Sequence, residues 1–531
     1  MNFNLTKADV LLINPPWLSK DQNIWHGIKG AMPSLGLLSV AAYLEQQGIS
    51  VQVLDIHVEK LSAEETKAII RQVAPKIVGL TVMTATSVPS YKIARLAKEV
   101  DSNILVVMGG VHAEAMPEEC LLNSAVDLIV RGDGELTFHR LVVEHLNGRS
   151  LLALTGISYR SGGRVVHMPP GETIMDLNKL PFPAYHLVPM EKYYPAMGAY
   201  KRLPAINMLM TRGCPGKCTF CNSAMTKLRT RDAELVVDEI IRLKKTYGIR
   251  EIQFYDDTFT IFKQNVFQFC ELMQKKKVDV TWTAFARTDC ISPELAKEMK
   301  AAGCHQILFG VESGDDGILE NIRKPIDREK TKWAHDIVRE SGIELRSAFI
   351  FGNMGENVKT MQNTLNFALE LNPDIAIFNI CTPYPGTQLF KWAKEHGYLK
   401  HEDWTEYELS TFLMNLPTVT DKELKDFYMY AYRKFYRRPT AVWRRLKAIS
   451  NISQVIDLFH AFTFIMLRHK IGARDIVRRD WAYHKKEDFF DYQLAEEVEM
   501  RLTYQLHYEP LHSHPLLSKV AVTDHTSDRM P

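Results

Sequence analysis

Three cysteines lie close together near the middle of the chain, at Cys214, Cys218 and Cys221. Iron–sulfur cubanes are normally held by four thiolates, and gaps of two or three residues let one loop wrap around the cluster. The next cysteine along the chain is Cys270, far from this loop. The spacing therefore predicts a [4Fe-4S] cluster in which three irons carry thiolates and the fourth iron is open for chemistry.

A structural zinc site is the main alternative for this loop. Such sites are normally closed by four ligands at characteristic spacings, and no cysteine or histidine pair accompanies the loop. Eight cysteines in 531 residues are also too sparse for a disulfide framework. The other cysteines are interpreted as packing or loop residues, namely Cys120, Cys290, Cys304 (with His305) and Cys381. An iron–sulfur cluster is the favoured interpretation.

The loop, with its CxxxCxxC pattern, resembles that of the radical S-adenosylmethionine (SAM) enzymes. The resemblance implies that the methionine part of SAM chelates the open iron and that Phe220 lies against the adenine. One-electron reduction in that family breaks a carbon–sulfur bond of SAM and gives methionine and a 5′-deoxyadenosyl radical. An external reductant such as flavodoxin or ferredoxin is implied as a partner. The protein has to bind, orient and exclude water.

The whole chain sets broad limits on the elements that position this loop. Its 531 residues predict two or three domains. A net charge of +2 with 46% hydrophobic residues is typical of a globular protein without a global electrostatic footprint. No apolar run is long enough to span a bilayer, and no secretory segment opens the chain. We expect a protein of the reducing cytoplasm.

The alternation of strand and helix patterns predicts an α/β chain. The expected parts are a doubly wound (Rossmann-like) domain at 1–150, a linker at 151–203, a partial (β/α)6 barrel at 204–415, a helical region at 416–507 and a disordered tail at 508–531. The first domain has five apolar runs, at 9–14, 51–55, 77–83, 104–108 and 127–130. Helical patterns separate them, which indicates a parallel sheet covered on both faces.

Ligands on such sheets bind outside the carboxyl ends of the strands. Four segments are expected there: Asn14–Trp17, Thr81–Thr84, Gly109–His112 and Arg131–Glu135. Glycines in two of these tips permit close backbone approach, although each glycine alone is also typical of an ordinary turn. No GxGxxG opens a helix after the first strand, which argues against a dinucleotide site.

Together these tips resemble the cobalamin-binding domain of the cobalamin-dependent radical SAM enzymes. The resemblance implies cobalamin contacts by Thr81, Thr84, Gly109, Gly110, His112, Gly132, Gly134 and Glu135. The segment around Asp55 and His57 superficially matches the Asp-x-His-x-x-Gly motif of other cobalamin modules, but Lys60 stands where glycine belongs. We interpret His57 as a loop residue and expect no histidine of this chain on the lower face of cobalt.

Six candidate strands follow, at 206–210, 251–255, 281–286, 306–310, 344–351 and 375–381, and they match the open six-stranded barrel of the family. Functional residues of such barrels collect at the carboxyl ends of the strands. The candidates for SAM contacts are Asp256, Asp257, Arg287, Glu312 and Arg346, and Tyr384 is the candidate facing the substrate. Carboxylates suit the ammonium or ribose of SAM, and arginine forks suit its carboxylate. Ion-pair networks inside the barrel are the alternative.

Basic and aromatic residues interleave beyond residue 427. A solvated helix face is the commonest cause, and nucleic-acid or anionic membrane surfaces are alternatives. No nucleic-acid module is evident, so no nucleic-acid partner is expected. The apolar stretch 461–467 suggests an interfacial helix and hence peripheral membrane contact.

The resemblance implies cobalamin-dependent radical methylation of an unactivated carbon or phosphorus centre. The substrate is expected to be a small molecule, such as a lipid, a tetrapyrrole or a natural-product intermediate. An oxidative cyclase similar to anaerobic magnesium-protoporphyrin IX monomethyl ester cyclase is the first alternative. A cobalamin- or redox-sensing iron–sulfur regulator is an alternative from another class, although it would require four-cysteine ligation. An RNA methylthiotransferase would require a second cysteine cluster.

Overall fold

The computed structural model describes residues 5–17, 30–324, 326–440 and 443–444. Its first unit is a seven-stranded sheet in the order β2-β1-β3-β4-β5-β6-β7. The first five strands are parallel and match the predicted runs: β1 (Val10–Asn14), β2 (Val51–Asp55), β3 (Ile77–Thr81), β4 (Leu105–Gly109) and β5 (Leu128–Val130). The strand order reverses between β1 and β3, which is the switch point where such folds bind ligands.

Helices cover both faces of this sheet. α1 (Leu35–Gln46) packs with α7 (Gly134–Leu146) on one face, and α3 (Ala63–Val73) packs with α4 (Ser87–Val100) on the other. Successive side chains of a strand point to opposite faces, so Leu11 and Leu12 belong to different core clusters. The short helices are α2 (Ile56–Glu59), α5 (Val111–Ala115) and α6 (Pro117–Leu122). The predicted doubly wound domain is confirmed.

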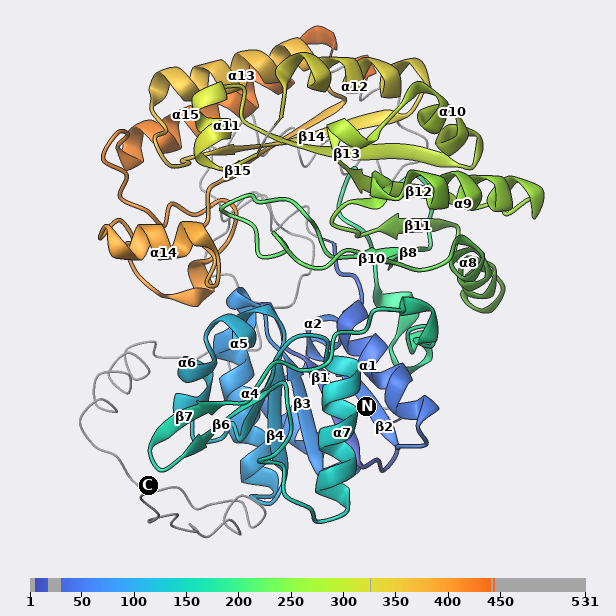
Figure 1. The fold of residues 1–531 in the computed structure, drawn as a ribbon, viewed down its shortest axis with the longest axis vertical. Helices are drawn as coiled ribbons and strands as arrows, with labels where there is room; N and C mark the ends of the chain where they lie inside the picture. Colours follow the sequence, from blue (N-terminus) through green and yellow to red (C-terminus); the bar gives the residue numbers. More distant parts are fainter. Residues whose placement is uncertain (1–4, 18–29, 325, 441–442, 445–531) are drawn as a thin grey trace, which may run out of the picture.

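The sheet continues past residue 150, where the sequence predicted a loop-rich linker. β6 (Ile157–Ser161) and β7 (Arg164–His167) form an antiparallel hairpin on the edge next to β5. Three short 3₁₀ turns follow, at Leu177–Lys179, Tyr185–Leu187 and Met190–Lys192. The remaining linker runs from the first unit to the second along the side of the molecule (Figure 1).

The second unit is a six-stranded parallel sheet in the order β15-β14-β13-β12-β11-β8. Its strands are β8 (Ala205–Met208), β11 (Glu251–Phe254), β12 (Thr281–Ala286), β13 (Cys304–Glu312), β14 (Glu344–Phe351) and β15 (Ile375–Ile380). β8 and β15 form its two edges, so the barrel is open as predicted. Its helices are α8 (Ala233–Tyr247), α9 (Lys263–Lys275), α10 (Pro293–Ala301), α11 (Asp316–Asn321), α12 (Arg328–Glu340), α13 (Val358–Leu371), α14 (Gln388–Glu395) and α15 (Asp421–Tyr436).

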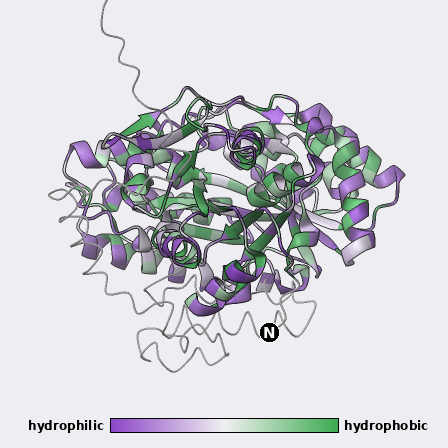
Figure 2. Cartoon of the chain, turned by 90° about the horizontal axis from the view of Figure 1, so that it is seen from below, coloured by the Kyte–Doolittle hydropathy of each residue, from purple (hydrophilic) through white to green (hydrophobic). Residues whose placement is uncertain are grey.

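α15 explains the aromatic part of the C-terminal region. Phe427, Tyr428 and Phe435 are buried, whereas Lys434 is exposed. The Tyr432 hydroxyl donates to the carbonyl of Phe378 (2.9 Å) and thereby fixes the helix to β15. Apolar strands fill the interior while polar residues lie outside (Figure 2). Stretch 461–467 and tail 508–531 lie outside the described residues, and no described helix is long and apolar enough to cross a membrane.

The amino end of the barrel is closed around Glu251, which is fully buried. One oxygen of its carboxylate accepts hydrogen bonds from the amides of Lys201 (2.8 Å) and Arg202 (2.7 Å), and from the Thr281 hydroxyl (2.9 Å). Its other oxygen lies 3.0 Å from Nε2 of His305. Glu251 thus ties the end of the linker to three barrel strands at the end opposite the carboxyl termini.

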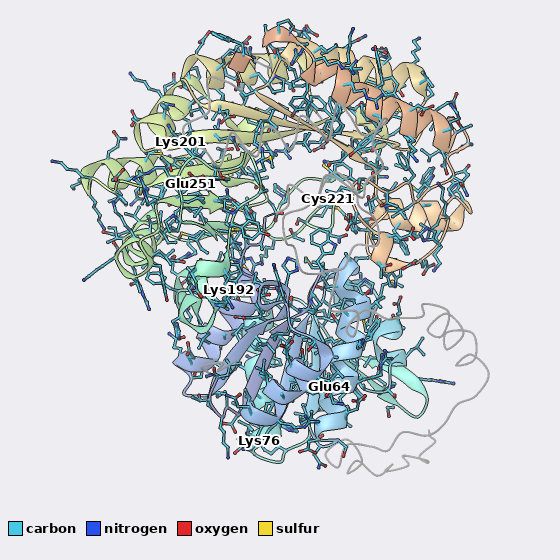
Figure 3. All side chains as sticks on the ribbon, turned by 180° about the vertical axis from the view of Figure 1, so that it is seen from behind. Glu64, Lys76, Lys192, Lys201, Cys221 and Glu251 are labelled. Carbon is cyan, nitrogen blue, oxygen red and sulfur yellow. The ribbon has the colours of Figure 1, made fainter. Side chains whose placement is uncertain are left out.

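Replacing Glu251 by Ala should lower the free energy of unfolding of the barrel by about 3 kcal/mol, because several buried donors lose their acceptor. Chemical denaturation followed by the fluorescence of the buried barrel residue Trp282 measures this change. Glu64→Ala is the matched control, since Glu64 is exposed on α3 (Figure 3) and should change stability by less than about 0.5 kcal/mol. Equal effects of the two changes would contradict the closing role of Glu251.

Candidate functional site

The three cysteines lie on a loop closed by a short antiparallel hairpin. β9 (Thr211–Arg212) pairs with β10 (Arg229–Thr230) at its base. The Cys214 amide donates to the Thr226 hydroxyl (2.9 Å), and the Thr226 amide donates to the Cys214 carbonyl (3.1 Å). Gly213 has φ +91°, and a Cβ there would lie 2.2 Å from the Lys227 carbonyl oxygen. The narrow neck therefore requires glycine before the first cysteine.

The far side of the loop is fixed to two barrel helices. The Thr219 amide donates to the Ile322 carbonyl at the end of α11 (3.0 Å), and the Leu389 amide of α14 donates to the Thr219 carbonyl (2.9 Å). The half-buried Phe220 packs on the cluster that contains Leu389 and Ile350. Phe220 is thus held beside the cysteines, and its contact with adenine stays a prediction.

The surroundings of the sulfurs fit a cluster. The Gly216 amide donates to Sγ of Cys214 (3.4 Å), and a Cβ at Gly216 would lie 3.2 Å from that sulfur and 3.4 Å from Nη1 of Arg287. Burial raises the pKa of Cys218 and Cys221, and on Cys218 the positive charges of Lys324 and Arg287 act in the opposite direction. Within the described part of the chain, no three His, Cys, Asp or Glu side chains form a site for one metal ion. A cubane instead takes each thiolate on a different iron.

Glu312 lies at the carboxyl end of β13 in an unusual backbone conformation. Its φ is +64°, and the pairing of β13 with β14 shifts register beside it. The carboxylate lies 2.5 Å from Nζ of Lys324, and a Cβ on Gly310 would lie only 2.4 Å from that carboxylate. The first glycine of Gly310-x-Glu-Ser-Gly314 therefore makes room for a buried ion pair. Since both charges act on Cys218, the pair lies near the cysteine loop.

The two predicted aspartates differ in exposure. Asp256 is fully buried, and its carboxylate accepts hydrogen bonds from the amides of Met210 (3.1 Å) and Thr211. It thus positions the backbone that leads into the cysteine loop. Asp257 is exposed, and its negative charge helps to raise the pKa of Cys221. Of the two, Asp257 is the better placed for a contact with bound SAM, and this contact stays a prediction.

The two predicted arginines lie in different surroundings. Arg287, at the end of β12, donates two hydrogen bonds to Asp289 (2.9 and 2.7 Å) and keeps Nη1 beside Gly216 of the cysteine loop. Arg346 lies within β14 and donates to Oε1 of Gln306 (3.3 Å). Both take part in networks of the barrel, and Arg287 is the one that reaches the cysteine loop.

The third and fourth sheet tips form a continuous platform. The Val82 amide donates to the Gly109 carbonyl (2.7 Å), and the Val82 carbonyl accepts from the His112 amide (3.1 Å). Gly110 has φ +101°, and a Cβ there would lie 2.9 Å from the Val82 carbonyl oxygen. Met83 and Val111 are each 49% exposed. Large exposed apolar side chains at the carboxyl ends of neighbouring parallel strands suit a broad, partly apolar ligand such as a corrin.

Two predicted threonines and His57 lie near the carboxyl ends of β3 and β2. Thr81 lies at the end of β3, half-buried, and Thr84 is buried in the turn before α4. Their contacts with cobalamin stay predictions. His57 accepts a hydrogen bond at Nδ1 from the Trp17 amide (3.3 Å). Its interpretation as a loop residue is wrong, because it lies in the short helix α2, which the Asp55 side chain caps.

His112 and Tyr384 both take part in aromatic packing between the two units. The His112 side chain is fully buried, and its ring packs edge-on against Trp404 (5.3 Å between centroids). The Trp404 indole donates to Glu119 of α6 (2.7 Å). The Tyr384 hydroxyl donates to the Tyr407 carbonyl (3.4 Å), and burial raises its pKa. Their side chains pack between the units, and their contacts with cobalamin and with the substrate stay predictions.

The fifth tip contacts the cysteine hairpin directly. Gly132 has φ +77° and Gly134 opens α7. Glu135 is 2% exposed, and its Oε1 accepts from Nη2 of Arg212 (2.7 Å). Asp133 accepts from Arg229 of β10. Glu135 thus forms an ion pair with the residue two positions before Cys214, and its contact with cobalamin stays a prediction.

The two units therefore face each other through their carboxyl ends. Figure 1 shows the barrel above the first unit, with α14 between them at one side. Figure 3 shows Cys221 between the two units. Sequence reasoning missed Arg212, Arg229, Lys324 and Trp404. Of these four, only Arg212 could have been noticed in the sequence, because it lies beside the cysteine motif. The roles of the other three depend on tertiary contacts.

Comparisons with known proteins agree with this arrangement. The chain matches the B12 binding domain family over residues 25–142 and the Radical SAM superfamily over residues 208–368. It is 35% identical to the uncharacterized methyltransferase PH0819 of Pyrococcus horikoshii, over 86% of this chain and 96% of that protein. It is 30% identical to the anaerobic magnesium-protoporphyrin IX monomethyl ester cyclase of Rubrivivax gelatinosus, over 80% and 77% of the two chains.

A solved structure shares the fold. The radical S-adenosylmethionine methyltransferase TsrM of Kitasatospora setae, with cobalamin and a [4Fe-4S] cluster bound, superposes with a TM-score of 0.64. The match covers 83% of this chain and 90% of that one at 18% identity. At this identity the likeness concerns the fold alone.

The buried Asp256 should make stability depend on pH in a defined direction. Burial raises its pKa from 3.8 to about 6, so the folded protein holds a proton that the unfolded chain has already released. The stability contributed by this group is complete below pH 3.8 and is lost as pH rises through about 6. Asp256→Asn does not titrate, so its stability relative to the wild type should rise by up to about 3 kcal/mol between about pH 4 and 7.

Denaturation of the cofactor-free protein at a series of pH values measures this difference. A difference between the two proteins that stays constant across the series would contradict the assignment of a buried, protonated carboxyl to Asp256.

Proposed function

The chain belongs to the cobalamin-dependent radical SAM enzymes, and from this premise we propose that it is a methyltransferase acting on an unactivated carbon or phosphorus centre. Its cofactors are a [4Fe-4S] cluster, SAM and cobalamin. The observation that carries the proposal is the opposition of the cysteine loop and the sheet-tip platform. A substrate between them can be reached from both sides, which is a positioning effect.

When bound, the cluster with SAM supplies a deoxyadenosyl radical and cobalamin supplies a methyl group. The chain's own residues provide the surroundings for this chemistry. Cys214, Cys218 and Cys221 hold the cluster, and the platform around Gly109 and Gly110 receives the corrin.

The charges near the cysteine loop match those of SAM. Arg287 and Lys324 are suited to its carboxylate, because both are positively charged and lie close enough to Cys218 to lower the pKa of that thiol. Asp257 and Glu312 are suited to its ammonium or its ribose hydroxyls. Mixed charges within one pocket orient a zwitterionic ligand, since each end of the ligand has its own partner.

An oxidative cyclase is the second candidate, because one relative at 30% identity is an anaerobic magnesium-protoporphyrin IX monomethyl ester cyclase. In either case we propose a small-molecule substrate, such as a lipid, a tetrapyrrole or a natural-product intermediate. Flavodoxin or ferredoxin would supply electrons. We also propose a cytoplasmic location, with peripheral membrane contact through the C-terminal region.

Anaerobic reconstitution with iron, sulfide and hydroxocobalamin, followed by mass analysis, distinguishes the candidates. With SAM and a one-electron reductant added, the proposed methyltransferase should form methionine and deoxyadenosine from one SAM, S-adenosylhomocysteine from the second SAM that methylates cobalamin, and a product heavier by one methylene unit. A cyclase should form a ring-closed product without the added methylene unit. Failure to cleave SAM under reducing conditions would favour a regulator and contradict both enzymes.

Replacing Cys218 by Ala should abolish deoxyadenosine formation, because the loop then offers only two thiolates to the cluster. Iron content, the cluster's optical absorbance and deoxyadenosine are the measurements. Cys290→Ala is the matched control, since Cys290 is half-buried near the barrel mouth but lies outside the loop. Unchanged turnover in Cys218→Ala would remove the radical SAM assignment.

A further inference from the structure

Four charged side chains join the fifth sheet tip to the cysteine hairpin. Asp133 and Glu135 come from the tip, and Arg212 and Arg229 face each other across the hairpin. Nη2 of Arg212 donates to Oε1 of Glu135 at 2.7 Å, and Nη1 of Arg212 lies 3.8 Å from Asp133. Arg229 pairs with the same Asp133. We call these four residues the ionic clamp.

The ionic clamp is not a surface salt bridge. The side chains of Glu135 and Arg229 are 3% and 9% exposed, and those of Asp133 and Arg212 are 15% and 22% exposed. Charges removed from water are stable only when they are paired and hydrogen-bonded. Two negative and two positive groups satisfy this condition together, so neither acid is available as a separate ligand.

Further hydrogen bonds fix the geometry of the ionic clamp. Arg229 also donates to the Ile174 carbonyl (2.8 Å), and Arg212 donates to the Ser39 hydroxyl of α1 (3.1 Å). The Ile174 amide donates to Asp133 (3.1 Å). Each planar guanidinium therefore binds two partners and has a defined orientation. Because Arg212 is two residues before Cys214, this orientation is passed to the start of the cysteine loop.

We propose that the ionic clamp positions the cysteine loop over the first unit, and that Asp133 and Glu135 act as contacts between the units instead of cobalamin ligands. These are positioning residues, since they act on the cofactors through the hairpin. The inference rests on the proposed function only in so far as the cysteine loop carries a cluster and the platform binds cobalamin.

The ionic clamp also has an electrostatic consequence for the cluster. Its formal charge is zero, so its effect on the cysteine loop is small while all four groups are present. Glu135→Gln leaves an uncompensated positive charge near the loop, which favours the reduced cluster and raises its midpoint potential. Arg212→Gln leaves a negative charge and lowers the potential. A structural disturbance alone would not produce opposite signs.

The test uses the full chain, reconstituted with cluster and hydroxocobalamin, in four variants. These are Glu135→Gln, Arg212→Gln, the charge swap Glu135→Arg with Arg212→Glu, and Glu172→Gln as the matched control. Glu172 forms an ion pair with Arg140 at 2.6 Å, but both side chains are about half exposed. Redox titration gives the potential, absorbance titration gives the Kd for hydroxocobalamin, and hydrogen exchange reports on the amides of residues 209–212.

The proposal predicts opposite shifts of potential in the two single variants, at least partial return in the charge swap, and faster exchange in the hairpin. The Kd for hydroxocobalamin should change by less than about twofold. Glu172→Gln should match the wild type. A Kd more than about tenfold weaker in Glu135→Gln, or unchanged hairpin exchange, would overturn the proposal.

Failure of the proposed function gives a different result. A wild-type protein that takes up neither cluster nor cobalamin would contradict the proposed function. Hydrogen exchange on the cofactor-free variants would still decide whether the ionic clamp holds the hairpin.

Discussion

Two parallel sheets with their carboxyl ends turned toward each other are the constraint on which the rest of the structure depends. The carboxyl end of a parallel sheet is where polar side chains and loop backbone become available to ligands. When two such ends face, some tips must carry contacts between the units. In this chain the fifth tip binds the cysteine hairpin through Glu135, and the fourth contacts Trp404 through His112. Glu119 of the following helix α6 accepts a hydrogen bond from the Trp404 indole. The backbone of the third and fourth tips, at Val82 and at Gly109–Val111, remains available to a ligand.

Burial and positive charge act in opposite directions on Cys218 in the cysteine loop. Burial is the main cause that raises the pKa of Cys218 and Cys221, whereas cluster binding requires thiolates. Lys324 and Arg287 supply opposing charge, and Glu312 and Asp289 hold these cations in turn. The positive φ of Glu312 belongs to the same balance, because the backbone shift at β13 turns its carboxylate back toward Lys324. Strain of this kind persists only where surrounding contacts enforce it.

Apolar runs and cysteine spacing predicted most of the fold, because both are local properties of the sequence. The strands at 51–55, 281–286 and 344–351 have the predicted bounds, and the open barrel and the doubly wound sheet follow from them. The roles of single side chains were less predictable. Glu135 and His112 were assigned to cobalamin, since nothing local to the tips shows that Arg212 and Trp404 would reach them. Arg212 lies 77 residues after Glu135. Trp404, the partner of His112, lies in the segment that follows β15.

The central claim is that three thiolates leave one iron of the cluster open to SAM, opposite the cobalamin platform. Mössbauer spectroscopy of protein reconstituted with ⁵⁷Fe tests this claim most directly. We expect one iron of the four to be distinct from the others, and its signal alone to change when SAM is added. Four irons that all remain unchanged on addition of SAM, or a spectrum without a four-iron cluster, would contradict it.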